Sequence, residues 1–185
     1  MNVYDFDETI YHGDSTRDFY FFCLKNYPKI AKYLPKQGYY AIKFGLKIMP
    51  KTQFKEKFYS FLKSVPDVDA AVEKFWQLHE KNLKGWYLEQ KKQDDLIISA
   101  SPEFLLKPIC DKLEIKLIAS RVDKFSGKTE GENCWGEEKV KRFNAAGGGE
   151  IEEFYSDSYS DTPLALLAKK AFLVKGNEIT LFFKK

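Results

Sequence analysis

Cysteine and histidine are scarce in this sequence of 185 residues, and long apolar runs are absent. The three cysteines, Cys23, Cys110 and Cys134, lie far apart and lack the close Cys/His spacing of a zinc site, so we interpret them as reduced thiols. No stretch reaches the roughly 18 uninterrupted apolar residues of a membrane-spanning helix. Because the N-terminus runs directly into polar residues, a signal peptide is not expected either. These features predict a soluble, cytoplasmic protein.

Acidic residues are nearly missing from one long stretch of the chain. Between Lys25 and Lys63 there are ten lysines and one acid, Glu56, whereas the whole chain has a net charge of only +3. The same stretch is rich in tyrosine and phenylalanine. A basic region attracts anions, and the candidates are a phosphorylated substrate, an anionic membrane surface and nucleic acid.

Short apolar runs followed by polar or turn residues predict the strands of one sheet. The expected strands are residues 2–4, 96–98, 117–119, 151–155 and 171–174, with a closing strand at 178–183. Helices are expected at 102–113, 137–146 and 162–169. Ser101 before Pro102, and Asp161 before Pro163, suit the N-caps of the first and last of these helices. The alternation predicts an α/β fold with a Rossmann-like, mostly parallel sheet and helices on both faces.

The interval between the first two strands has a helical pattern throughout and is too long for a crossover connection. We therefore predict a catalytic core formed by residues 1–12 and 90–185, and an inserted helical cap formed by residues 13–89. Residues 121–135 carry two glycines between alternating residues and should form a hairpin or an extended loop.

One helix of the predicted cap has a basic amphipathic pattern. Lys36, Lys43 and Lys47 recur at helical spacing. The apolar row beside them consists of Tyr40, Phe44 and Ile48. We expect this row to pack against neighbouring helices while the lysines stay in water. A helix that lies on an anionic membrane is the alternative.

Six polar residues stand just beyond expected strand ends or at the start of a helix, where a doubly wound sheet binds its ligands. Asp5 and Asp7 come after the first expected strand, and Ser99 comes after the second. The other three, which flank the strand 151–155, are Lys139, Asp157 and Asp161. We expect all six to converge on one crevice.

These residue types form a chemically complete set for phosphoryl transfer. Carboxylates in one crevice repel one another unless a cation binds them, and Mg²⁺ prefers oxygen ligands. Asp5 can then attack phosphorus, while Asp7 can protonate the leaving oxygen and later deprotonate the attacking water. Ser99 can donate a hydrogen bond to a phosphoryl oxygen, and Lys139 can supply a positive charge. The set predicts magnesium-dependent hydrolysis through an aspartyl-phosphate intermediate.

The same residues stand in four motifs that resemble those of the haloacid dehalogenase (HAD) superfamily of phosphatases. Its first motif, Asp-x-Asp-x-Thr, corresponds to Asp5-Phe6-Asp7-Glu8-Thr9, and its second, a Ser or Thr after an apolar strand, to Leu96-Ile97-Ile98-Ser99. The motif lysine corresponds to Lys139, and the paired acids correspond to Asp157 and Asp161. All four occur in order over nearly the whole chain. The surroundings of the motifs are similar to the phosphoserine-phosphatase-like branch, which carries a C1 cap.

The resemblance implies roles for further residues. Asp157 would join Asp5 as a side-chain ligand of magnesium, Asp7 would add its backbone carbonyl, and Asp161 would support the metal site or Lys139. The residues expected near the substrate are Thr9, Asp14, Ala100 and Ser101. Because that branch grips a substrate carboxylate with a cap arginine, the lack of arginine from residue 18 to residue 120 argues against phosphoserine.

We therefore predict a magnesium-dependent phosphatase acting on a small phosphorylated metabolite. A lipid-phosphate phosphatase is one alternative, since the HAD phosphatase of phosphatidylglycerophosphate has a similar layout, although this chain lacks that family's hydrophobic insertion. A phosphotransferase is another. A nucleic-acid-binding module is the least favoured, so no nucleic-acid partner is expected. Peripheral membrane contact through the basic cap stays open, and nothing in the sequence marks an interface between copies.

Overall fold

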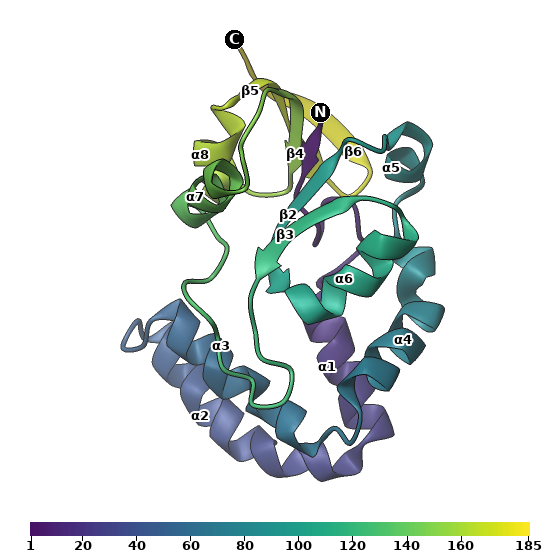
Figure 1. The fold of residues 1–185 in the computed structure, drawn as a ribbon. Helices are drawn as coiled ribbons and strands as arrows, with labels where there is room; N and C mark the ends of the chain where they lie inside the picture. The colour runs from purple at the N-terminus through teal and green to yellow at the C-terminus, as the bar shows by residue number, and fades with distance from the viewer.

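The computed structural model describes residues 1–185 and contains one six-stranded sheet with helices on both sides (Figure 1). Its strands are β1 (Val3–Tyr4), β2 (Leu96–Pro102), β3 (Lys116–Ser120), β4 (Ile151–Ser156), β5 (Ala168–Lys175) and β6 (Glu178–Lys184). They lie in the order β3-β2-β1-β4-β5-β6, and all neighbours are parallel except β5 and β6. The predicted α/β fold and all six strands are confirmed.

Successive residues of the central strands pack on opposite faces of the sheet, because side chains alternate along a strand. Val3 joins a core with Phe143 of α7 (Glu137–Ala145) and Leu164 of α8 (Thr162–Ala165). Tyr4 joins a larger core on the other face, to which α6 (Glu103–Lys112) and several helices of residues 15–90 contribute. Both faces are therefore buried, which explains why these strands are continuous apolar runs.

Residues 13–90 are almost entirely helical, as predicted. The helices are α1 (Ser15–Asn26), α2 (Leu34–Gly45), α3 (Lys51–Tyr59), α4 (Val68–His79) and α5 (Gly85–Gln90), with short 3-10 turns between them. α2 and α3 lie at the end of the molecule opposite β6 (Figure 1). Phe19 of α1 and Phe75 of α4 share the larger core with Tyr4. The division into a core and a cap at residues 12–13 and 89–90 stays a prediction.

None of the helices combines the length and the hydrophobicity that crossing a bilayer takes. The three cysteines are free and buried, as expected for reduced thiols.

One predicted helix cap was wrong, and a second has the predicted position without the capping hydrogen bond. β2 continues through Pro102, so Ser101 lies in the strand and caps no helix. Asp161 occupies the N-cap position of α8, but its side chain makes no capping hydrogen bond. Both side chains bind other polar residues instead, so tertiary contacts override the local capping signal. α8 also ends at Ala165 rather than at residue 169, because Ala168 already pairs with β4 as part of β5.

Candidate active site

The carboxyl ends of β1, β2 and β4 border one cavity of about 560 Å³. Its lining includes nearly all residues that the sequence singled out: Asp5, Asp7, Asp14, Ser99, Ala100, Ser101, Lys139, Asp157 and Asp161. Thr9 is not among them, and its side chain is completely buried. Residues from both ends of the chain thus meet at one point, while their functional roles stay predictions.

Lys139 connects two of the carboxylates. The first turn of α7 places it in the cavity, where Nζ donates hydrogen bonds to Asp5 Oδ1 (2.8 Å) and Asp161 Oδ2 (2.7 Å). Burial alone would lower the pKa of Lys139, but the two carboxylates outweigh burial and raise it. Lys139 is therefore a permanent cation in the site, whereas the nearby Lys141 lies in solvent.

Asp5 follows β1 directly and is fixed by the sheet. Its backbone N–H donates to the Tyr155 carbonyl (2.9 Å), which continues the pairing of β1 with β4. Burial raises the pKa of Asp5 to about 7; the Lys139 charge opposes this rise, and the Asp161 charge adds to it. Lys139 is thus the contact that favours the ionised form of Asp5.

Asp7 is held by donors from two elements. The Ser15 N–H at the start of α1 donates to Oδ1 (2.7 Å), and the Ser101 hydroxyl donates to Oδ2 (2.5 Å). Ser101 Oγ also lies 2.9 Å from the Thr16 hydroxyl. Burial, with the charge of Asp14, raises the pKa of Asp7 to about 6, and the hydrogen bonds oppose the rise. Ser101 therefore orients Asp7, which the capping signal in the sequence did not reveal.

Asp157 and Asp161 form hydrogen bonds with buried hydroxyl groups. The Asp157 N–H donates to Thr9 Oγ1 (2.9 Å), so Thr9 braces Asp157 rather than lying where it could reach a substrate. The Ser156 hydroxyl donates to Asp161 Oδ2 (2.8 Å), a contact that the sequence did not indicate. The other oxygen of Asp161 is buried without a hydrogen-bond partner.

The opposite wall of the cavity comes mainly from α1 and α3, which the sequence did not assign to the site apart from Asp14. It is made of basic and aromatic side chains: Arg17, Tyr20, Phe21, Lys51, Phe54, Lys55, Phe58 and Tyr59. Lys55 Nζ donates to the Ala100 carbonyl (2.7 Å) and to Asn133 Oδ1 (2.7 Å), and burial lowers its pKa to about 8. Asp14 is also the N-cap of α1, since its Oδ1 accepts the Arg17 N–H (2.8 Å). The lysine-rich composition of this stretch indicated a basic surface, but the spacing of the lysines along the sequence could not show which of them face the cavity.

The loop of residues 121–136, between β3 and α7, lies along α3 and holds this wall in place. An antiparallel bridge between Val122 and Thr129 gives the loop its predicted hairpin character. Four residues of the loop contact four residues of α3. Trp135 makes a cation–π contact with Lys51, and hydrogen bonds join Glu132 to Thr52, Asn133 to Lys55, and Thr129 to Glu56. Gly127 (φ +73°) lies so close to α3 that a Cβ there would be 2.4 Å from the Tyr59 carbonyl oxygen. Helix and loop therefore form one packed unit over the cavity.

The oxygen donors of the site fit a hard divalent cation. Asp5, Asp157 and Asp161 line one cavity, and Lys139 forms ion pairs with Asp5 and Asp161. One oxygen of Asp161 has no hydrogen-bond partner. The structure contains no group of three or more acidic, histidine or cysteine side chains close enough to hold a metal ion by themselves. Mg²⁺ commonly binds one or two protein carboxylates and fills its shell with water and substrate phosphate. The arrangement suits that kind of site.

The sequence model of the haloacid dehalogenase-like hydrolases matches residues 3–166. The chain belongs to this HAD hydrolase family. The match extends from β1 through α8 and thus includes Asp5, Ser99, Lys139, Asp157 and Asp161. No curated protein matches the chain.

Several solved structures share the fold of this HAD hydrolase at low sequence identity. A protein of unknown function from Bordetella pertussis Tohama I aligns with a TM-score of 0.77 and 20% identity, over 92% of this chain and 87% of that chain. A phosphoserine phosphohydrolase-like protein from Francisella tularensis subsp. tularensis SCHU S4 aligns with a TM-score of 0.54 and 16% identity, over 92% of this chain and 86% of that chain. A probable phosphoserine phosphatase from Vibrio cholerae aligns with a TM-score of 0.64 and 13% identity, over 92% of this chain and 55% of that chain. The fold is therefore similar to that of the phosphoserine-phosphatase-like branch.

Proposed function

We propose that this HAD hydrolase is a phosphatase that removes phosphate from small phosphomonoesters, with Mg²⁺ as cofactor and a phosphorylated Asp5 as intermediate. The observation that carries the proposal is the presence of Asp5 and Asp7 in one cavity, each oriented by different donors. Lys139 engages one oxygen of Asp5, and the donors on Asp7 come from α1 and β2. The phosphoserine phosphatases among the solved structures of the same fold support a phosphatase.

Two proton transfers by Asp7 balance the reaction. In the first step an oxygen of Asp5 attacks phosphorus, the bond to the leaving oxygen breaks, and Asp7 donates its proton to that oxygen. In the second step Asp7 takes a proton from water, whose oxygen attacks the phosphorus on Asp5. The bond between phosphorus and Asp5 then breaks, which releases inorganic phosphate and restores the carboxylate.

Other residues of the cavity stabilise the transferring group. The Ser99 hydroxyl oxygen accepts the Ser101 N–H (3.1 Å), which leaves the hydroxyl proton free to be donated to a phosphoryl oxygen. Lys139 adds a fixed positive charge where negative charge develops. Asp5 and Asp157, with the Asp7 carbonyl, would hold Mg²⁺. When bound, the ion neutralises charge on the phosphoryl oxygens.

The wall from α1 and α3 favours substrates that carry an apolar or aromatic portion beside the phosphate. Phe54 and Phe58 border the cavity, with Lys51 and Lys55 at the same wall. A cytoplasmic location suits the three free thiols. A phosphotransferase would share the first step and differ only in using an alcohol in place of water.

Phosphate release from an aryl phosphate and from a panel of phosphorylated metabolites, with and without Mg²⁺, tests the proposal. We expect magnesium-dependent turnover that Asp5→Asn lowers by at least roughly 10³-fold. Asp18→Asn, a carboxylate outside the cavity, serves as the matched control. Folded, magnesium-loaded wild-type protein that hydrolyses none of these compounds would contradict the proposal. Product analysis with added alcohols separates hydrolysis from transfer.

A further inference from the structure

A row of exposed apolar side chains lies on α2 and on Leu46, the residue that follows it. Tyr39, Ile42 and Leu46 follow one another at helical spacing and are 53%, 66% and 65% exposed. Gln37 is the only buried residue of the helix. Exposed apolar residues are common singly, whereas a continuous row on one helix face marks a binding surface.

The opposite face of α2 is fixed to the rest of the molecule, so the outer row is not a loosely placed segment. Gln37 accepts a hydrogen bond from the Tyr20 hydroxyl (2.7 Å) and donates one to the Phe58 carbonyl (2.8 Å). Phe44 stacks on Phe54 with ring centroids 4.7 Å apart. The row Tyr40, Phe44 and Ile48 was expected to pack against neighbouring helices, and this holds only in part. Tyr40 is half-buried and Phe44 stacks on Phe54, whereas Ile48 is 66% exposed.

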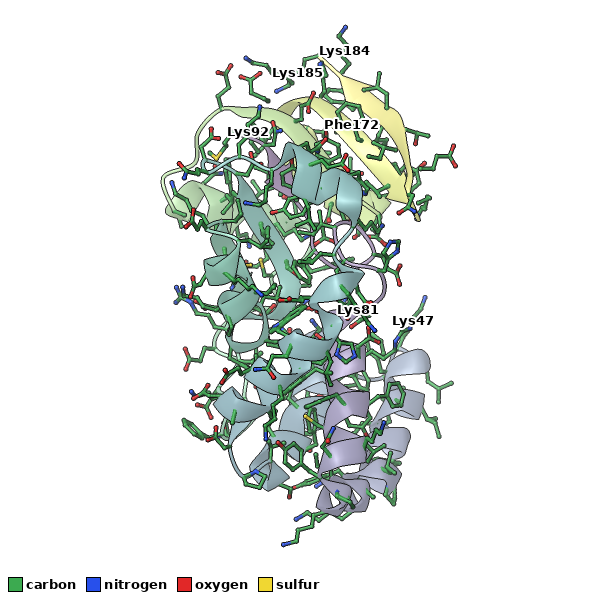
Figure 2. All side chains as sticks on the ribbon, turned by 90° about the vertical axis from the view of Figure 1, so that its right-hand side faces the viewer. Lys47, Lys81, Lys92, Phe172, Lys184 and Lys185 are labelled. Atoms are coloured by element: carbon green, nitrogen blue, oxygen red, sulfur yellow. The ribbon has the colours of Figure 1, made fainter.

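The surroundings of the outer row are basic. Residues 19–55 contain eight lysines and no acid. Lys36, Lys43 and Lys47 run beside the row at helical spacing, and none of them forms an ion pair within the chain. Lys43 Nζ lies 4.8 Å from the centre of the Tyr39 ring, and Lys47 projects from the edge of the molecule (Figure 2). An apolar row flanked by lysines that form no ion pair complements a surface that is apolar inside and anionic outside.

The chain leaves α2 through a left-handed turn. Lys47 has φ +58°, a conformation that glycine usually occupies at helix ends. The turn is closed by a hydrogen bond from the Ile48 N–H to the Lys43 carbonyl (3.0 Å). It leaves both Lys47 and Ile48 exposed.

We infer that the outer face of α2 binds the surface of an anionic phospholipid bilayer. Tyr39, Ile42 and Leu46 enter the boundary between headgroups and acyl chains, and the lysines beside them contact lipid phosphates. A second copy of the chain is disfavoured, because two such faces would bring lysines against lysines. Nucleic acid would leave the aliphatic side chains uncovered. This inference concerns a surface and does not depend on the proposed phosphatase activity.

Co-sedimentation of the full chain with vesicles tests the inference. We expect binding to vesicles of phosphatidylcholine mixed with phosphatidylglycerol, weak or no binding to pure phosphatidylcholine, and weakening by salt. The double variant Ile42→Ser/Leu46→Ser should bind at least roughly tenfold more weakly, because membrane affinity scales with buried apolar area. Lys36→Gln/Lys43→Gln/Lys47→Gln should also lose binding.

The matched control is Leu78→Ser/Leu88→Ser, which removes two exposed leucines from α4 and α5 and should bind like the wild type. Circular dichroism checks that each variant is folded. The inference is overturned if folded wild-type protein does not bind the phosphatidylglycerol vesicles, or if the Ile42/Leu46 variant binds them as well as the control does. Sedimentation that shows a dimer disrupted by the same variant would assign the row to a second copy instead and would also overturn it.

Discussion

The two walls of the cavity differ in how they are built. The wall at the strand ends is charged and held by short hydrogen bonds, such as those from Lys139 to Asp5 and Asp161. The wall from α1 and α3 is aromatic and basic, and it is held to the core by Lys55 and by the 121–136 loop. The first arrangement suits chemistry that is the same for every substrate, and the second suits recognition of the group that differs between substrates. Changes to the two walls should therefore have different signatures.

The largest effect is expected from Lys139→Met. Removing this lysine leaves Asp5 and Asp161 buried without their counter-charge, which should lower the free energy of unfolding by roughly 3 to 5 kcal/mol and turnover by roughly 10²-fold or more. Urea unfolding and phosphate release measure the two effects. Lys141→Met, a solvent-exposed neighbour on α7, should change neither. A stable, active Lys139→Met variant would show that the strand-end wall is not held as described.

The next effect concerns pH and the opposite wall. Lys55 has a folded-state pKa of about 8 against an ordinary value of 10.5, because of burial. Between these two values the unfolded chain binds more protons than the folded chain, so the free energy of unfolding should rise with pH, by up to about 3 kcal/mol in total. Below the folded pKa both states are protonated and the contribution does not change. Urea unfolding of wild type and Lys55→Met on either side of the folded pKa measures it; a parallel pH dependence of the two proteins would contradict it.

A smaller effect tests the contact between helix and loop. Gly127→Ala places a Cβ against the Tyr59 backbone and in an unfavourable left-handed conformation, which should cost about 1 to 3 kcal/mol of stability. Gly131→Ala is the matched control, since its φ is also positive (+78°) but its nearest neighbour is an Arg142 side-chain atom at 4.0 Å. Thermal unfolding of both variants separates the steric clash from the conformational strain. Equal losses would mean that the close approach contributes nothing.

The smallest effect should appear only in substrate preference. Phe54→Ala removes an aromatic ring from the helical wall and should raise KM for an aryl phosphate by roughly tenfold, with a smaller change in kcat. A small aliphatic phosphate should show little change. Phe125→Ala, an exposed ring outside the cavity, is the control. A fall in kcat without a change in KM would contradict this prediction and would indicate that the helical wall acts in the catalytic step.

The sequence predicted the strand-end wall well, because each of its residues follows a recognisable strand or opens a helix. Asp5 and Asp157 directly follow strands, and Ser99 lies inside β2 because that strand is longer than predicted; the sheet brings all three to one cavity. The helical wall could not be predicted in the same way, since Lys51 and Lys55 look like any other lysine of the basic stretch. Their inward direction depends on how α3 packs against a loop some 70 residues away, and local pattern carries no information about such a contact.

Local signals also misled where a tertiary partner competed with them. Ser101 before a proline has the pattern of a helix cap, but its hydroxyl donates to Asp7 instead. The apolar positions of α2 predicted one packed face, whereas the helix carries a second apolar row that faces outward. A hydrophobic pattern shows that a face avoids water and does not show whether the same chain covers it.

The pairing of α3 with the 121–136 loop also provides a natural reporter of opening. The Thr129 backbone N–H donates to Glu56 Oε1 at 3.1 Å, so this amide is protected only while helix and loop stay together. Amide exchange with deuterated water follows local openings of this kind. The exchange rate of the Thr129 amide therefore reports how often the loop separates from α3, the helix that supplies Lys51 and Lys55 to the cavity.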